Sequence, residues 1–121
     1  MSDVVTRLRA LLSEATPGRW RVASDSTDQV YAEDGDMVAE TWGTNLVEDA
    51  LVIVALHNAA DALLAVAEAA QRFYAANAAW VEFSAEGDIM DDQAADELGN
   101  ALEDADATLV AALAELSKVQ L

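Results

Sequence analysis

The sequence predicts an α+β fold, in which an N-terminal helix, a three-stranded antiparallel meander and a long antiparallel helical hairpin form a single domain over residues 1–121. Apolar residues recur every three or four positions over residues 4–15 and again beyond residue 47, which is the period of an amphipathic helix. Between these segments, short alternating runs are separated by turn residues, as in strands. The helix and small sheet are therefore expected within residues 1–45 and the hairpin within residues 46–121.

The first helix is predicted from one apolar face, and it ends at a proline. The face consists of Val4, Val5, Leu8, Leu11, Leu12 and Ala15, while Arg7 and Arg9 lie off it. Thr16 is pushed out of the helical region by the proline that follows it. Pro17 and Gly18 suit the two central positions of a type II turn. The turn reverses the chain so that the helix can pack onto the sheet.

Three short strands are predicted after this turn. The first, "RWRV" at residues 19–22, alternates so that Trp20 and Val22 share one side. We therefore expect Trp20 to be buried between the sheet and the helices. The second strand is "QVYA" at residues 29–32. The Asp34-Gly35 pair is a strong hairpin signal before the third strand, "MVAETW" at residues 37–42.

The helical hairpin is predicted from two apolar stripes. The stripe of the helix over residues 47–80 is Val52, Leu56, Ala59, Leu63, Val66, Ala70 and Phe73. Its opposing polar stripe is His57, Asp61, Glu68 and Arg72. The last helix takes Asp91 as its N-cap, and its stripe is Leu98, Leu102, Ala105, Leu109, Leu113 and Leu116. A flank through Ile53 and Leu64 makes the apolar surface wider than one partner helix covers, so we expect a homo-oligomer, a dimer or a tetramer.

Composition restricts the function classes. The chain has 27 alanines, so its core is expected to be thin, and it has no cysteine for a disulfide. Six basic residues face 23 acidic ones, and a net charge of -17 argues against direct binding of nucleic acid. No run of about 18 uncharged apolar residues was found, so no membrane association is expected and the predicted location is the cytoplasm.

Acidic residues dominate the segment from Glu82 to Asp106, which has ten acids and no base. One interpretation is a solvated helix face that keeps an alanine-rich protein soluble. The other is a surface that imitates DNA phosphates for a basic partner. Under that interpretation the candidate partner-binding residues are Asp92, Asp96 and Glu103.

The search for catalytic, cofactor and metal chemistry predicts none. His57, Asp61 and Glu68 lie along one helical stripe, which a solvated polar face explains as well as a metal site does. The acids over residues 86–92 lack the order of an EF-hand loop, and a magnesium site built from Glu68 and the acidic residues of the last helix would need stripes that point outward. Three aromatic residues are further candidates for a partner-binding pocket: Trp20, Tyr31 and Trp42.

Two motifs resemble the Ead-like family of small bacteriophage early-region proteins. The first is a helix running into "ATPGRW", with matches at Ala15, Thr16, Pro17, Gly18 and Trp20. The second lies in "EDALVIVALHNAADALL", with matches at Asp49, Ala50, Ile53, Ala55, Asn58, Leu63 and Leu64. The resemblance covers roughly residues 5–70. It departs from the family at Arg19, where Pro or Glu is commoner, and after Asn58, where a proline often follows.

This resemblance implies a phage setting and an accessory role, and it carries over no catalytic residue. The leading hypothesis is a non-enzymatic bacteriophage accessory protein that acts by protein–protein contacts in the host cell. A second hypothesis is an acidic DNA mimic that inhibits a host DNA-binding or defence protein. A third is a small-ligand protein that sequesters nucleotides in a pocket between subunits, which would require Arg7, Arg9, Arg19 and Arg21 to converge across an interface.

Overall fold

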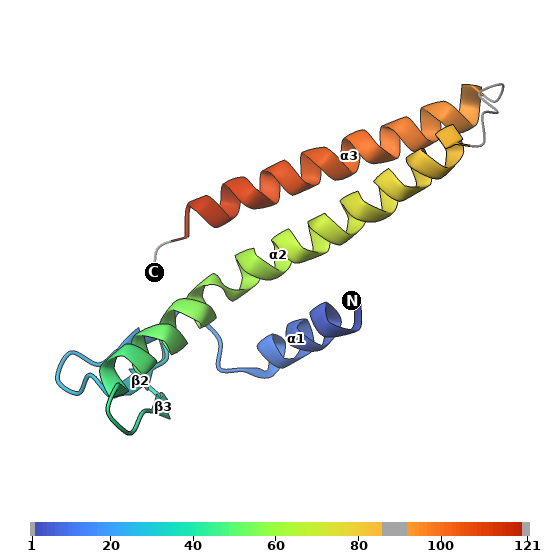
Figure 1. The fold of residues 1–121 in the computed structure, drawn as a ribbon. Coiled ribbons are helices and arrows are strands. Elements are labelled where there is room, and N and C mark those ends of the chain that lie inside the picture. The colour runs from blue at the N-terminus through green and yellow to red at the C-terminus, as the bar shows by residue number, and fades with distance from the viewer. Residues whose placement is uncertain (1, 86–91, 120–121) are drawn as a thin grey trace. The chain divides into compact units, whose positions relative to one another are not determined.

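The computed structural model describes residues 2–85 and 92–119 and confirms the α+β fold with its helical hairpin (Figure 1). The elements follow in the order α1 (Ser2–Glu14), β1 (Arg21–Val22), β2 (Gln29–Tyr31), β3 (Met37–Glu40), α2 (Leu46–Ala85) and α3 (Asp92–Ser117). The predicted N-cap of the last helix, Asp91, lies outside the described residues. Two compact units divide the chain, one centred on residues 3–61 and the other on residues 62–118, so the division falls inside α2.

At the Pro17-Gly18 turn the structure shows the positive φ that the sequence predicts for the glycine. The amide of Ala15 still donates to the carbonyls of Leu11 and Leu12, which closes the last turn of α1. Gly18 then takes a φ of 87°, the left-handed value required at the third position of a type II turn. A Cβ at this position would lie 2.5 Å from Oε2 and 3.0 Å from Cβ of Glu33. Gly18 is therefore required both by its backbone conformation and by the closeness of Glu33.

The sheet is an antiparallel meander in the order β1-β2-β3, as predicted. The amide of Gly35 donates to the carbonyl of Ala32, and Gly35 has a φ of 95°, so the hairpin between β2 and β3 closes with a glycine in the left-handed region. A bulge interrupts the register between Val30 and Tyr31. The Asp34-Gly35 signal is thus confirmed as a hairpin.

The core is thin, as the alanine content predicts. Of the eight buried apolar residues among those described, six are alanines: Ala23, Ala32, Ala50, Ala59, Ala69 and Ala105. The other two are Val30, which is fully buried in β2, and Leu64 of α2. Thr41 is the buried polar residue, and its hydroxyl bonds the carbonyl of Leu46 while its amide donates to that of Asp28. This pairing ties the end of β3 to the start of α2.

Two predicted apolar faces are more exposed than the sequence indicated. On α1, Val4, Leu8 and Leu11 are 61%, 46% and 56% exposed. Val5, Leu12 and Arg9 are half-buried instead, so the inner side of α1 is rotated from the predicted face toward Arg9. On α2, the predicted stripe residues Val52, Leu56 and Leu63 are exposed, whereas Leu64 on the flank is buried.

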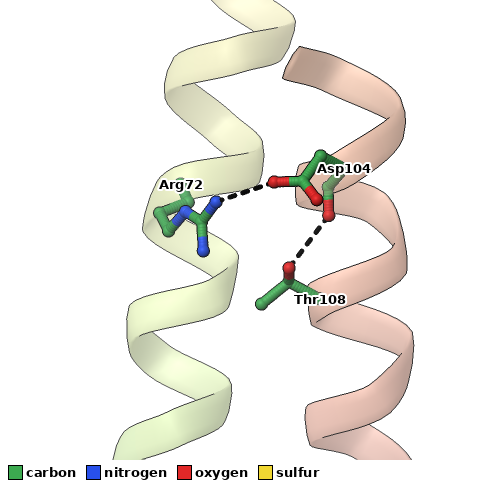
Figure 2. Close-up of polar contacts among 3 residues, drawn as sticks. All are labelled: Arg72, Asp104 and Thr108. Atoms are coloured by element: carbon green, nitrogen blue, oxygen red, sulfur yellow. Dashed lines mark hydrogen bonds and ion pairs between the residues drawn. The ribbon is translucent and has the colours of Figure 1, made fainter. Parts of the chain in front are cut away.

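In the unit of residues 62–118, α3 runs antiparallel to the later part of α2 (Figure 1). Trp80 contacts Gly99, where an added Cβ would lie 3.8 Å from Cζ3 of the indole. Arg72, earlier in α2, pairs with Asp104, later in α3, at 3.1 Å, and Thr108 donates to the Asp104 carbonyl (Figure 2). From Arg72 to Trp80 the residue number rises along α2, while that of the partner falls from Asp104 to Gly99 along α3. The two contacts therefore define an antiparallel register.

Helix α2 is long and apolar enough to cross a membrane by length and composition, the one such helix in the described part of the chain. Asp61 is the single charged residue between Asp49 and Glu68, so the helix still has no run of about 18 uncharged apolar residues. The core helix of a soluble protein has the same length and composition but is mostly buried, whereas 17% of this apolar stretch is buried.

Candidate functional site

The candidate site is a pocket of about 470 Å³ beside the Pro17-Gly18 turn, here called the turn pocket. Its walls come from the C-terminal half of α1, from the turn itself and from one stretch of α2, all within the unit of residues 3–61. The lining residues are Arg9, Leu12, Ser13, Ala15, Thr16, Pro17, Gly18, Arg19, His57, Asn58 and Asp61. Its volume lies within the range of about 300–1,000 Å³ that is typical of small-molecule sites.

Asn58 of α2 holds the chain that leaves the turn. The backbone amide of Trp20 donates to its Oδ1 at 2.9 Å, and its Nδ2 donates to the Trp20 carbonyl at 3.0 Å. The side-chain amide thus satisfies both backbone groups of Trp20 in the way that a neighbouring strand would. These bonds replace the ladder bonds that Trp20 lacks, because β1 begins only at Arg21.

His57 forms the adjacent part of the wall. Its ring stacks on the indole of Trp20, with centroids 3.6 Å apart and planes 4° from parallel. Its Nε2 lies 2.9 Å from the carbonyl oxygen of Gly18, and because a carbonyl only accepts, Nε2 carries the hydrogen and donates it. The indole N–H donates in turn to the carbonyl of Thr16 at 3.0 Å.

These positions correct two interpretations of the sequence. His57 is half-buried rather than fully exposed on a polar stripe, since one face of its ring is stacked on Trp20. Trp20 is half-buried rather than fully buried, and it precedes the strand instead of belonging to it. The alternation in "RWRV" predicted a strand from residue 19, whereas the hydrogen-bonded strand begins at Arg21. At Trp20 the backbone bonds the side chain of Asn58 instead of a neighbouring strand.

An ion pair closes one side of the turn pocket. Arg9 of α1 donates through Nη1 to Oδ1 of Asp61 in α2 at 2.9 Å. The side chains are 39% and 86% exposed, so solvent screens the pair and its contribution to stability is about 0–1 kcal/mol. Arg19 also lines the pocket, and its amide lies 3.4 Å from Oε2 of Glu33. Two of the four N-terminal arginines therefore line one pocket within a single chain, whereas the sequence interpretation required all four to converge across an interface between subunits.

Two polar side chains of the turn pocket, Ser13 and His57, are engaged in hydrogen bonds to backbone carbonyls. The hydroxyl of Ser13 donates to the carbonyl of Ala10 at 2.7 Å, so it is engaged in capping α1. The proton on Nε2 of His57 is engaged by Gly18. Over residues 2–85 and 92–119, no group of three or more His, Cys, Asp or Glu residues has an arrangement that could hold a metal ion.

The candidate partner-binding residues lie in separate places. The hydroxyl of Tyr31, in β2, donates to Gln29, and its ring lies 5.7 Å from the guanidinium carbon of Arg21. Trp42 follows β3 and is 78% exposed. In the described part of the chain, no ring-to-ring contact joins Trp20, Tyr31 and Trp42 to one another. On α3, the side chains of Asp92, Asp96 and Glu103 are exposed, and their spacing puts them on one side of the helix.

Comparisons with known proteins give no match: no family model, no curated protein and no solved structure is similar to this chain. The site is therefore defined by its geometry. Sequence reasoning named Asn58 in the second motif and the turn residues in the first, but it did not bring the two motifs together. The stack of His57 on Trp20 and the Asn58 pairing join them.

Proposed function

We propose that this protein is a non-enzymatic accessory protein that acts through protein–protein contacts, in the first place between its own copies. The observation that carries this proposal is the row of Val4, Leu8 and Leu11 along α1, which are 61%, 46% and 56% exposed. The three side chains follow at intervals of four and three residues and so share one face. A row of large apolar side chains in water is typical of an interaction surface.

The balance of forces favours association at this face. Each large apolar side chain that becomes covered contributes about 1.5–3 kcal/mol. Repulsion opposes it because each copy has a net charge of -17, but charges farther apart than about 8 Å are screened at physiological ionic strength. Arg7 and Arg9 also make α1 the most basic helix of the chain. An α1 surface is therefore better suited to contact a second copy than the acidic α3 is.

The bacteriophage setting, and with it the cytoplasm of the host cell, is proposed from the Ead-like resemblance alone. Its motif residues Gly18 and Trp20 contact His57 and Asn58 of the second motif, which ties the turn to α2. This agrees with an accessory role in which the motifs maintain the fold.

Light scattering after size exclusion tests self-association at micromolar concentration and about 0.15 M salt. We expect a mass of at least twice the 12.8 kDa of one chain, and a mass of one chain in Leu8→Gln/Leu11→Gln. Ala10→Gln is the matched control, because Ala10 is exposed on the other side of α1. A single-chain mass for the unmodified protein across a tenfold dilution would contradict the proposal.

Mimicry of DNA remains the second candidate, because Asp92, Asp96 and Glu103 are exposed on one side of α3. The unit of residues 62–118 has only two bases, Arg72 and Lys118. A mimic must bind its basic partner less tightly as salt rises, and the triple variant with Asn, Asn and Gln at the three positions must lose that binding. Salt-independent binding, or full binding by the triple variant, removes mimicry and leaves contact recognition.

A further inference from the structure

We propose that the turn pocket binds a small organic phosphate. The pocket is lined by Arg9 of α1, Arg19 of the turn and His57 of α2. Guanidinium groups present a planar fork of donors that matches phosphate oxygens. Elsewhere the chain is strongly acidic, so two arginines on one concave surface make this pocket the part of the described protein best suited to an anion.

The size of the pocket favours an organic phosphate over a bare ion. At about 470 Å³ the pocket leaves room for an organic group beside the phosphate. Leu12, Ala15 and Pro17 are apolar lining residues beside which that group would lie, while Ser13 and Thr16 are polar ones. One ring face of His57 is stacked on Trp20, which holds the ring in place as a rigid wall.

Asp61 is the residue whose substitution should strengthen phosphate binding instead of weakening it. Its carboxylate accepts from Arg9 at 2.9 Å, so it competes with an incoming phosphate for the same guanidinium. The carboxylate is 86% exposed, and an ion pair so exposed to solvent is readily exchanged. Removing this carboxylate should therefore tighten phosphate binding, whereas removing either arginine should weaken it.

The probe is adenosine monophosphate, titrated into the full-length, 15N-labelled protein to about 10 mM, which detects a millimolar Kd. We expect saturable shifts of the Gly18 and Arg19 amides and none at Gly99, which lies against Trp80 in the other unit. Inorganic phosphate should compete, and adenosine should not bind. Equal binding of adenosine, or no saturable shift with the monophosphate, would overturn the proposal.

Charge-matched variants separate a site from general electrostatic attraction. Arg9→Gln and Arg19→Gln should each raise the Kd at least about fivefold, and Asp61→Asn should lower it. Arg21→Gln and Asp25→Asn make the same charge changes outside the pocket lining and should change the Kd less than about twofold. Melting curves show that each variant is folded. An Arg21→Gln effect as large as that of Arg19→Gln would show that the attraction is unspecific and would refute the site.

Discussion

Trp20 and His57 stack with ring centroids 3.6 Å apart and planes 4° from parallel. This contact joins the segment after the Pro17-Gly18 turn to the first part of α2, and the Nε2 bond to the Gly18 carbonyl lies at its edge. The pair thus fixes both the direction in which the chain leaves the turn and the wall of the turn pocket.

The stack should be measurable as a coupling energy. Trp20→Ala is expected to lower the free energy of unfolding by about 2 kcal/mol. The removal of a fully buried aromatic side chain costs about 3–5 kcal/mol, and the loss is smaller here because Trp20 is half-buried. A double-mutant cycle with His57→Ala, followed by urea denaturation, should give a coupling of about 0.5–1.5 kcal/mol. Trp42→Ala is the control, since Trp42 is 78% exposed. A cost no greater than that of the control would mean that the stack does not form.

The stabilising effect of Asn58 should require its donor group, Nδ2, as well as its acceptor, Oδ1. Asn58→Asp keeps the shape of the side chain, but places a carboxylate oxygen against the carbonyl of Trp20, which Nδ2 now reaches at 3.0 Å. We expect a loss of about 1–3 kcal/mol in the free energy of unfolding, at least as large as that of Asn58→Ala. Asn77→Asp, on the exposed side of the later part of α2, is the matched control. Equal stability of Asn58→Asp and the unmodified protein would rule out this pairing.

Gly18→Ala should destabilise through two separable effects. The φ of 87° costs a non-glycine residue about 1–2 kcal/mol, and the new Cβ would meet Oε2 of Glu33 at 2.5 Å and its Cβ at 3.0 Å. Gly35→Ala isolates the backbone effect, because Gly35 has a φ of 95° but nothing within 4 Å of an added Cβ. In thermal melts Gly18→Ala is therefore expected to be the more damaging substitution.

The Glu33→Gly background removes the crowding at Gly18 and provides the second arm of this test. There, Gly18→Ala should cost only about as much as Gly35→Ala does in the unmodified chain. If the cost of Gly18→Ala were the same with and without the Glu33 side chain, the predicted closeness of the two residues would be contradicted.

Much of the fold follows from local sequence signals. The Pro17-Gly18 and Asp34-Gly35 pairs locate two reversals of the chain. Apolar residues that recur at intervals of three and four positions locate all three helices. These signals are readable because they depend on backbone preferences of a few neighbouring residues. The long α2 was predicted over residues 47–80 and extends over Leu46–Ala85.

The site was less predictable, because it depends on how elements distant in the sequence meet. Periodicity shows which residues share a face, but not which neighbour covers that face. On α1, periodicity favoured the row with Val4 and Leu8 as the inner side, but these two residues are exposed. The inner side includes Arg9, which is half-buried and pairs with Asp61. His57 was placed on a solvated stripe for the same reason. Only the tertiary arrangement shows that Trp20 covers it.

The hairpin of the unit over residues 62–118 should depend on close packing far more than on its ion pair. Ala105 of α3 is 2% exposed, so Ala105→Leu forces three further carbon atoms into filled space and should cost about 1–3 kcal/mol. Arg72 and Asp104, whose pairing Figure 2 shows, have side chains that are 58% and 72% exposed, so Arg72→Gln or Asp104→Asn should cost less than about 1 kcal/mol. Ala107→Leu, at an exposed position of the same helix, is the control for the added bulk.

Urea denaturation at low and high salt decides between the two contributions, because screening weakens an ion pair but leaves apolar packing in place. A larger loss from Asp104→Asn than from Ala105→Leu would mean that charge, and not the small side chains along the helices, holds α3 against α2.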